Sequence, residues 1–210
     1  MRADEVKVYD TSKELVNKEV FHVDWDVSAA EKGGYEHFMI KEIMEQPKAL
    51  TDTIKPRIQN GEVVLDDITL TKDQLEQVDK ISHCGLWLGL PILASWPSTS
   101  SKASPVSRWR WIWRRNSGNR DPILTKNTLV VIISQSGETA DTLAALRYAK
   151  QQGARTLAIV NVVGSSIAKE SDDVIYTWAG PEIAVATTKA YSCQLAVLYL
   201  LGVYVGRQLG

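Results

Sequence analysis

The feature that most constrains the fold of this chain is a short apolar run that stops at a polar loop. Residues 129–133 read Leu-Val-Val-Ile-Ile, a continuous and largely β-branched run. Such a run is typical of a strand buried on both faces of a parallel sheet. Residues 134–139, Ser-Gln-Ser-Gly-Glu-Thr, follow it directly, and a helical pattern containing Leu143 and Leu146 begins after them. The stretch therefore predicts a strand, a polar loop and a helix in immediate succession.

The polar loop at residues 134–139 has the composition of an anion site. A loop between a buried strand and a helix presents free backbone N–H groups and the positive end of the helix dipole. Ser134, Ser136 and Thr139 add hydroxyl donors, whereas the loop contains no Lys or Arg. This pattern favours a phosphate on a small neutral molecule over a metal-bound triphosphate. The alternative is an ordinary strand-to-helix turn with a capping box, for which Thr139 replaces the usual Glu or Gln.

Alternating patterns continue after the loop and indicate the fold class. Strands are expected at residues 128–134, 155–160 and 173–178, and helices at residues 139–152, 165–170 and 186–208. Strands and helices that alternate at this spacing predict an α/β fold with a doubly wound parallel sheet. The ligand crevice of such a sheet lies at the carboxyl ends of its strands.

The chain before residue 81 predicts a smaller and less regular arrangement, in which a short β-hairpin and a linker precede the sheet. The expected elements are hairpin strands at residues 6–9 and 21–25, a linker at 30–34, helices at 35–46, 49–58 and 72–80, a turn at 60–61 and a weak strand at 62–65. Pro47 is expected to end the first of these helices, because proline cannot continue a helix interior.

Composition excludes several classes of function. The chain has 24 basic and 25 acidic residues, which gives no reason to expect nucleic acid or an anionic membrane as a partner. Cys84 and Cys193 lie far apart, so we expect no disulfide, no metal site and no cofactor. The N-terminus lacks the apolar segment of a signal peptide, and the longest apolar run, residues 195–205, is too short to cross a bilayer. A cytoplasmic protein is therefore expected.

Several strings of the chain resemble one known family. The loop at residues 134–139 resembles the phosphosugar loop of sugar isomerase (SIS) domains, and further strings resemble the glutamine–fructose-6-phosphate aminotransferase (isomerizing) family. These further strings are residues 21–25, 31–39, 41–47, 156–166, 176–183 and 188–191. The resemblance covers nearly all of residues 1–80 and 120–210, and its length and variety make it specific.

The resemblance implies part of a two-part enzyme. In this family a glutaminase releases ammonia, and an isomerase half built from two SIS domains uses it to convert fructose 6-phosphate into glucosamine 6-phosphate. Residues 1–28 then correspond to the edge of the glutaminase, residues 29–80 to the linker and leading helices, and residues 81–210 to the first SIS domain, with a flavodoxin-like fold. The implied partners are the phosphosugar, the rest of the enzyme and, because the family is usually dimeric, a second subunit.

The resemblance also assigns candidate site residues. The substrate-binding candidates are Ser134, Gln135, Ser136, Thr139, Val185 and Thr187. The first four match the phosphate-binding loop, and the last two match positions that line the sugar. Alternatively, Thr187, Thr188 and Lys189 are simply the start of a helix. No catalytic residue is expected in this chain, because the family's nucleophilic cysteine lies upstream and its acid–base Glu, His and Lys lie beyond Gly210.

Residues 82–118 do not fit the family pattern. They hold five of the seven tryptophans and a low-complexity stretch at residues 98–107. Tryptophan has a single codon, TGG, so each tryptophan reveals the three nucleotides that encode it. In a shifted frame, residues 108–118 permit Val-Glu-Val-Asp and a terminal Glu-Phe-Arg, and residues 83–87 permit Ile-Val-Ala-Cys-Gly in the other frame. Both peptides resemble the family. We infer compensating frameshifts, real or from sequencing, so the visible Cys84-Gly85 is not the family's Cys-Gly.

The altered segment has a physical consequence. Its three prolines interrupt any helix, so we expect the sheet to lose one or two strands and the product to be unstable and prone to aggregation. An alternative is a functional basic and aromatic patch at residues 108–115, which would stack on single-stranded nucleic acid or lie at a membrane interface.

Three functions compete at this point. The first is a fragment of the aminotransferase that binds the phosphosugar. The second is a stand-alone SIS module or regulator that senses a phosphosugar, and the third is a nucleic-acid or membrane binder that uses the Trp/Arg segment. The hairpin and linker expected before residue 35 favour the first, because a regulator has no need for the tail of a glutaminase.

The frameshift hypothesis makes a prediction about the gene. Translated in its shifted frames across codons 82–118, the nucleotide sequence is expected to encode the first strand, phosphate loop and second strand of the family. Sequencing the gene checks this. Tryptophan codons with no family-like peptide in either alternative frame would contradict it.

Overall fold

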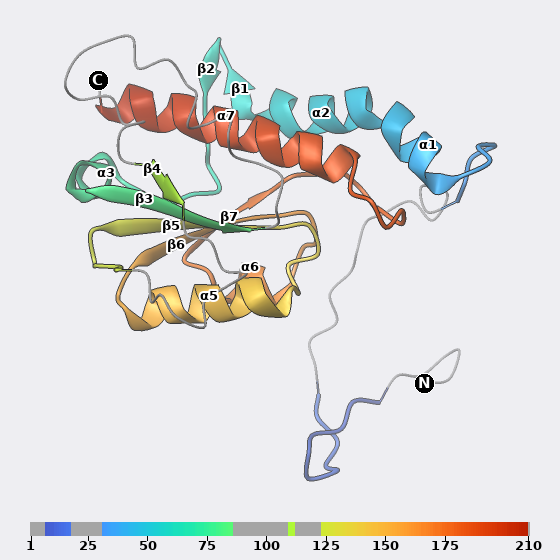
Figure 1. The fold of residues 1–210 in the computed structure, drawn as a ribbon, viewed down its shortest axis with the longest axis horizontal. Helices are drawn as coiled ribbons and strands as arrows, with labels where there is room; N and C mark the ends of the chain where they lie inside the picture. Colours follow the sequence, from blue (N-terminus) through green and yellow to red (C-terminus); the bar gives the residue numbers. More distant parts are fainter. Residues whose placement is uncertain (1–6, 18–30, 86–108, 112–122, 210) are drawn as a thin grey trace.

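A computed structural model describes residues 7–17, 31–85, 109–111 and 123–209 of the 210-residue chain (Figure 1). Its helices are α1 (Phe38–Met44), α2 (Gln46–Ile54), the 3₁₀ helix η2 (Lys55–Arg57), α3 (Lys72–Gln77), α5 (Ala140–Gln151), α6 (Ser166–Glu170) and α7 (Lys189–Leu209). Its strands are β1 (Ile58–Gln59), β2 (Glu62–Val63), β3 (Lys80–Gly85), β4 (Trp109–Trp111), β5 (Thr128–Ser134), β6 (Arg155–Val160) and β7 (Asp173–Tyr176).

The main sheet is parallel and has the strand order β4-β3-β5-β6-β7. The chain moves from β3 to β4 in one direction and from β5 to β7 in the other, so the order reverses between β3 and β5. This is the flavodoxin-like order, in which ligands bind at the carboxyl ends of the strands beside the reversal. The predicted α/β fold with a doubly wound sheet is confirmed.

Strand β5 is the buried centre of this sheet. Leu129, Val131 and Ile133 point to one face and share a cluster with α7, whereas Val130 and Ile132 point to the other and share a cluster with α5 and α6. All five are between 0% and 8% exposed. Successive side chains of a strand point to opposite faces, so an unbroken apolar run needs a covering layer on each side.

Helices provide these two layers. Helices α5 and α6 cover one face of the sheet, and α7 covers the other with α2 lying beside it (Figure 1). Ala49 of α2 packs against Ala190 and Cys193 of α7, and these small side chains allow the two helices to approach closely. The start of α7 is thereby fixed against α2.

The short elements before the sheet show where the expected boundaries were wrong. The first helix begins at Phe38 and ends at Met44, and Pro47 lies in the first turn of α2 instead of after a helix end. Proline is tolerated there because the first helical N–H groups have no partner within the helix. The expected turn at Asn60-Gly61 is confirmed between β1 and β2, with φ values of 53° and 79°.

Other boundaries also differ from the expected ones. Residue Tyr9 forms an isolated antiparallel bridge with Leu15, whereas the expected partner strand at residues 21–25 lies outside the described residues. Helix α3 ends at Gln77, and β7 ends at Tyr176, since Trp178 has a φ of 49°, outside the extended region.

The expectation that the sheet loses one or two strands is wrong. Strand β3 pairs with β5 in parallel over six residues, from Lys80 opposite Thr128 to Gly85 opposite Ile133, and β4 pairs with β3 over three. Ladder hydrogen bonds join backbone groups, so they tolerate a changed sequence. Ile81 of β3 is 2% exposed. The remainder of the altered segment, residues 86–108 and 112–118, lies outside the described residues.

A buried carboxylate joins the chain before the sheet to the sheet itself. Asp173, whose side chain is fully buried, accepts hydrogen bonds from the backbone N–H of Thr69 at 2.7 Å and from its hydroxyl at 2.8 Å. Its other oxygen accepts from Nε of Arg155 at 2.9 Å. Both oxygens of this carboxylate therefore serve to hold the loop before α3 against the start of β6.

Replacing Asp173 with Ala is expected to lower the free energy of unfolding by about 3–5 kcal/mol, because it leaves a partly buried guanidinium without its counter-ion. Urea unfolding followed by circular dichroism measures this. The control Asp66→Ala removes an exposed carboxylate three residues before Thr69 and is expected to change stability by less than about 0.5 kcal/mol. Equal effects of the two variants would contradict the assigned role of Asp173.

Candidate functional site

The polar loop at residues 134–139 lies at the carboxyl end of β5, beside the point where the strand order reverses. Its backbone is fixed from two sides. The carbonyl of Gln135 accepts a hydrogen bond from the N–H of Asn161 at 3.1 Å, and the carbonyl of Gly137 accepts one from the N–H of Ile167 at 3.0 Å. The loop is therefore held by the end of β6 and by α6, in the place where a flavodoxin-like sheet binds its ligand.

The hydroxyl groups of the loop have different surroundings. Ser134 is 4% exposed, and its Oγ accepts from the N–H of Gly137 at 3.0 Å and lies 3.2 Å from Oγ1 of Thr139. Oγ of Ser136 accepts from the N–H of Glu138 at 3.2 Å. The backbone N–H groups of Gly137 and Glu138 are therefore bonded within the loop and are not among the free groups that the sequence predicts. Ser134 shapes the loop from inside, whereas Ser136 and Thr139 are closer to its surface.

The start of α5 carries no side-chain cap. Thr139 occupies the N-cap position and its side chain makes no capping hydrogen bond, so the capping box of the alternative is not formed, whereas an ordinary strand-to-helix turn remains the alternative prediction. Within the described part of the chain, the N–H groups of Ser136 and Thr139 make no hydrogen bond. An uncapped helix start with hydroxyls around it suits an anion, because its N–H groups and dipole both favour negative charge.

Gly137 is the residue that the loop geometry requires. Its φ is 68°, and a Cβ atom built on it would lie 2.0 Å from Oγ of Ser165. The loop therefore packs directly on Ser165, which is 4% exposed and whose Oγ has no partner among the described residues. Sequence reasoning missed this contact, for which the only signal was the string Gly-Ser-Ser at residues 164–166.

Glu138 ties the same loop to α6. Its Oε1 accepts the backbone N–H of Ser166 at 2.7 Å, and the hydrogen bonds from the backbone and side chain of Ser166 lower the pKa of Glu138. The carboxylate therefore occupies the start of the short helix α6, which leaves the start of α5 as the open helix end at this loop.

Val185 and Thr187 lie in the segment between β7 and α7. The side chain of Val185 is fully exposed, and Thr187 is partly buried. In the described residues, no hydrogen bond joins either of them to the loop at residues 134–139. Helix α7 begins at Lys189, whose Nζ lies 2.7 Å from Oε2 of Glu45. Lys189 is thus a structural residue at a helix start, as the alternative predicted, whereas Thr187 lies before the helix.

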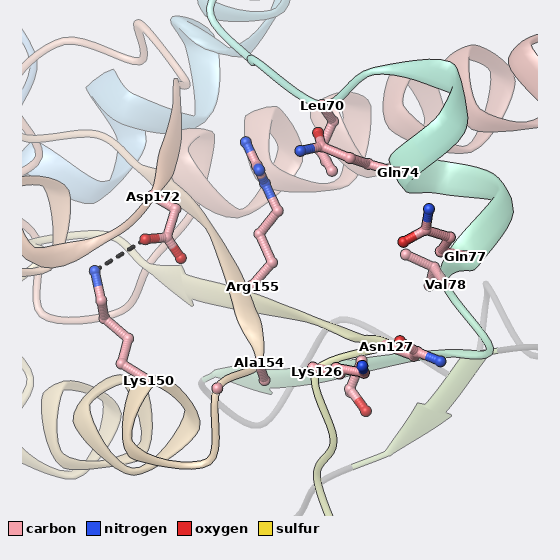
Figure 2. Close-up of a pocket in the computed structure, with 12 residues that line it drawn as sticks. Leu70, Gln74, Gln77, Val78, Lys126, Asn127, Lys150, Ala154, Arg155 and Asp172 are labelled. Atoms are coloured by element: carbon pink, nitrogen blue, oxygen red, sulfur yellow. Dashed lines mark hydrogen bonds and ion pairs between the residues drawn. The ribbon is translucent and has the colours of Figure 1, made fainter.

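A cavity of about 420 Å³ lies at the other end of the strands, near the amino ends of β5 and β6 (Figure 2). It is lined by Leu70, Gln74, Gln77, Val78, Lys126, Asn127, Thr128, Lys150, Gly153, Ala154, Arg155 and Asp172. None of the predicted site residues lines it. Two of its cations already pair with acidic side chains, Lys150 with Asp172 at 3.0 Å and Arg155 with Asp173 at 2.9 Å. The cavity therefore differs from the loop at residues 134–139, where hydroxyl groups surround an uncapped helix start.

The described residues contain neither a candidate metal cluster nor a candidate membrane span. No cluster of three or more His, Cys, Asp and Glu side chains there has the arrangement needed to hold a metal ion. None of the helices described is both long and apolar enough to cross a membrane.

Comparison with known proteins agrees with this geometry. The SIS domain family matches residues 118–204. A glutamine–fructose-6-phosphate aminotransferase (isomerizing) of Clostridium acetobutylicum is 51% identical over 208 residues, which cover 95% of this chain and 33% of that protein. The solved C-terminal domain of glucosamine-fructose-6-phosphate aminotransferase from Francisella tularensis aligns with a TM-score of 0.68 and 33% identity, over 85% of this chain and 50% of that one.

A more distant structure shows the shared fold alone. A protein of Escherichia coli strain CFT073 aligns with a TM-score of 0.52 and 21% identity, over 81% of this chain and 87% of that one. The chain spans about one third of the length of the curated relatives it matches. Residues 118–204 therefore match the SIS domain family, and nearly the whole chain is similar to a stretch that makes up about one third of the length of glutamine–fructose-6-phosphate aminotransferases, as its sequence strings indicate.

Proposed function

We propose that this chain is part of an enzyme that makes glucosamine 6-phosphate from fructose 6-phosphate and glutamine, and that its loop at residues 134–139 binds the phosphate of the sugar. The observation that carries the proposal is the uncapped start of α5 at the carboxyl end of β5. The identity of about half of all aligned residues to named aminotransferases supports the choice of substrate.

The residues of the loop have different roles in the proposed binding of the phosphate. The hydroxyls and the backbone N–H groups of Ser136 and Thr139 donate to the phosphate oxygens, while Ser134 holds the loop in shape through the N–H of Gly137. Gln135 lies at the entrance of the loop. The dipole of α5 adds a favourable interaction with the dianion. Val185 and Thr187 line the sugar. The acid–base chemistry of the isomerisation is not assigned to any residue of this chain.

The organisation of the chain follows from the same proposal. Residues 1–28 belong to the edge of a glutaminase, residues 29–80 form the linker and leading helices, and residues 81–210 form the first SIS domain. The remaining parts of the enzyme and a second subunit are its partners, and the cytoplasm is its location. The frameshift hypothesis for residues 82–118 belongs to this proposal too, since it explains why the family pattern is interrupted there.

The second candidate is a stand-alone SIS module that senses a phosphosugar. One observation favours it: the E. coli protein is aligned over 87% of its own length, so the fold that it shares with this chain makes up nearly all of that protein. The genome separates the candidates. A sequence encoding a second SIS domain directly downstream supports the enzyme, whereas an unrelated downstream gene supports the module.

Fructose 6-phosphate is expected to bind the chain, and Ser136→Ala and Thr139→Ala are each expected to weaken binding about 10- to 100-fold, because each removes a hydrogen bond to a charged group. Isothermal titration calorimetry measures the dissociation constants. Inorganic phosphate is expected to compete with the sugar, since the proposed contacts are to the phosphate.

The matched control is Thr51→Ala, which removes an exposed hydroxyl on α2 that donates to the carbonyl of Pro47. This variant is expected to bind like the unaltered chain. Absence of binding by the unaltered chain at millimolar sugar, or equal affinities for all four proteins, would show that residues 134–139 are not a phosphosugar site.

A further inference from the structure

A buried carboxylate on α1 reaches the segment that carries Val185. Glu42 is 2% exposed, and its Oε1 accepts the backbone N–H groups of Ile183 at 2.7 Å and of Ala184 at 3.0 Å. These two residues immediately precede Val185 in the chain, although they are 141 and 142 positions after Glu42. One oxygen atom therefore fixes the backbone at the point where the segment turns toward its exposed residues.

The remaining anchors of the segment hold only its ends. Nδ2 of Asn161 donates to the carbonyl of Gly180 at 2.7 Å, and Oε1 of Glu182 accepts the N–H of Thr188 at 2.8 Å. For residues 183–187, the hydrogen bonds found within the described chain are the two to Glu42. The segment has no helix or strand of its own, so its middle depends on that carboxylate.

The surroundings fix the position of Glu42 itself. Glu45, one turn further along, pairs with Lys189 at 2.7 Å, and Gln46 accepts a hydrogen bond from Ser192 at 2.5 Å. These contacts lock α1 and the start of α2 to the first turn of α7. The position of the Glu42 carboxylate is therefore determined by the packing of α1 and α2 on α7 and does not depend on the segment.

The hydrogen bonds that Glu42 accepts do not require its negative charge. Its Oε2 is buried and has no partner among the described residues, so both bonds to the segment use Oε1. Burial raises the pKa of Glu182, and the negative charge of Glu42 acts in the same direction. A neutral group with an oxygen in the place of Oε1 would keep both hydrogen bonds and remove this repulsion.

We propose that Glu42 is a positioning residue of the sugar site, which holds the segment bearing Val185 and Thr187 in its binding conformation through the N–H groups of Ile183 and Ala184. The inference rests on the proposed function for the assignment of Val185 and Thr187 to the sugar. It gives the leading helices of residues 29–80 a role in the binding site, because Glu42 lies on α1 and supports the segment from there.

Two variants of Glu42 distinguish the length of its side chain from its charge. Glu42→Asp keeps the charge but withdraws the oxygen by one methylene, and is expected to weaken fructose 6-phosphate binding at least about 10-fold, because apparent affinity falls with the fraction of protein in the competent conformation. Glu42→Gln keeps the oxygen in reach and is expected to stay within about 3-fold of the unaltered chain. Calorimetry gives the affinities, and hydrogen exchange of residues 180–188 reports on the segment, which is expected to exchange faster only in Glu42→Asp.

The control is Asp52→Ala, which removes an acidic residue of α2 that pairs with Lys48 on the surface and is expected to leave both readouts unchanged. Unchanged affinity and exchange in Glu42→Asp, or equal losses in Glu42→Asp and Glu42→Gln, would overturn the inference. If the unaltered chain does not bind the sugar, the proposed function fails, and exchange alone decides on Glu42: faster exchange in Glu42→Asp supports its hold on the segment, and no change refutes it.

Discussion

The burial of β5 on both faces is the constraint on which the rest of the structure depends. An unbroken apolar strand in the middle of a sheet leaves no polar side chain to face water, so α5 and α6 must cover one face and α7 the other. The polar residues of this part of the chain are thereby restricted to the ends of the strand. At the carboxyl end, the reversal of strand order between β3 and β5 leaves room for the loop at residues 134–139.

The two loops of the candidate site are joined by one buried asparagine. Asn161, 3% exposed at the end of β6, donates its backbone N–H to the carbonyl of Gln135 in the loop at residues 134–139. Its Oδ1 accepts from Thr177 at 3.1 Å and from Ala179 at 2.8 Å, and its Nδ2 donates to Gly180 at 2.7 Å. These four hydrogen bonds link the loop after β5 to the chain after β7. Moving either loop away from Asn161 would leave a buried polar group without its hydrogen bond, which costs free energy.

The sequence was informative where the determining interactions are local. The alternation of strands and helices after residue 128 and the position of the polar loop follow from patterns within a few residues, and the structure confirms them. The role of Glu42 depends on partners up to 142 residues away, which no local pattern indicates. Pro47 shows the same limit at short range, because proline marks both the end of a helix and the first turn of one. The strand count at the altered segment was also wrong, since backbone pairing with β5 does not require the family's side chains.

The two parts of the candidate site, the loop at residues 134–139 and the segment bearing Val185 and Thr187, are held in place by different interactions. The loop at residues 134–139 is stabilised by its own hydroxyls and by contacts to the end of β6 and to α6, which follow it closely in the chain. The segment bearing Val185 and Thr187 is held by Glu42 of α1 and, at its start, by Asn161 after β6, while Glu45 pairs with Lys189 at the start of α7. Its position therefore depends on the packing of the leading helices on α7. Under the proposed function, recognition of the phosphate therefore depends on the sheet, whereas recognition of the sugar also depends on the helices that precede it.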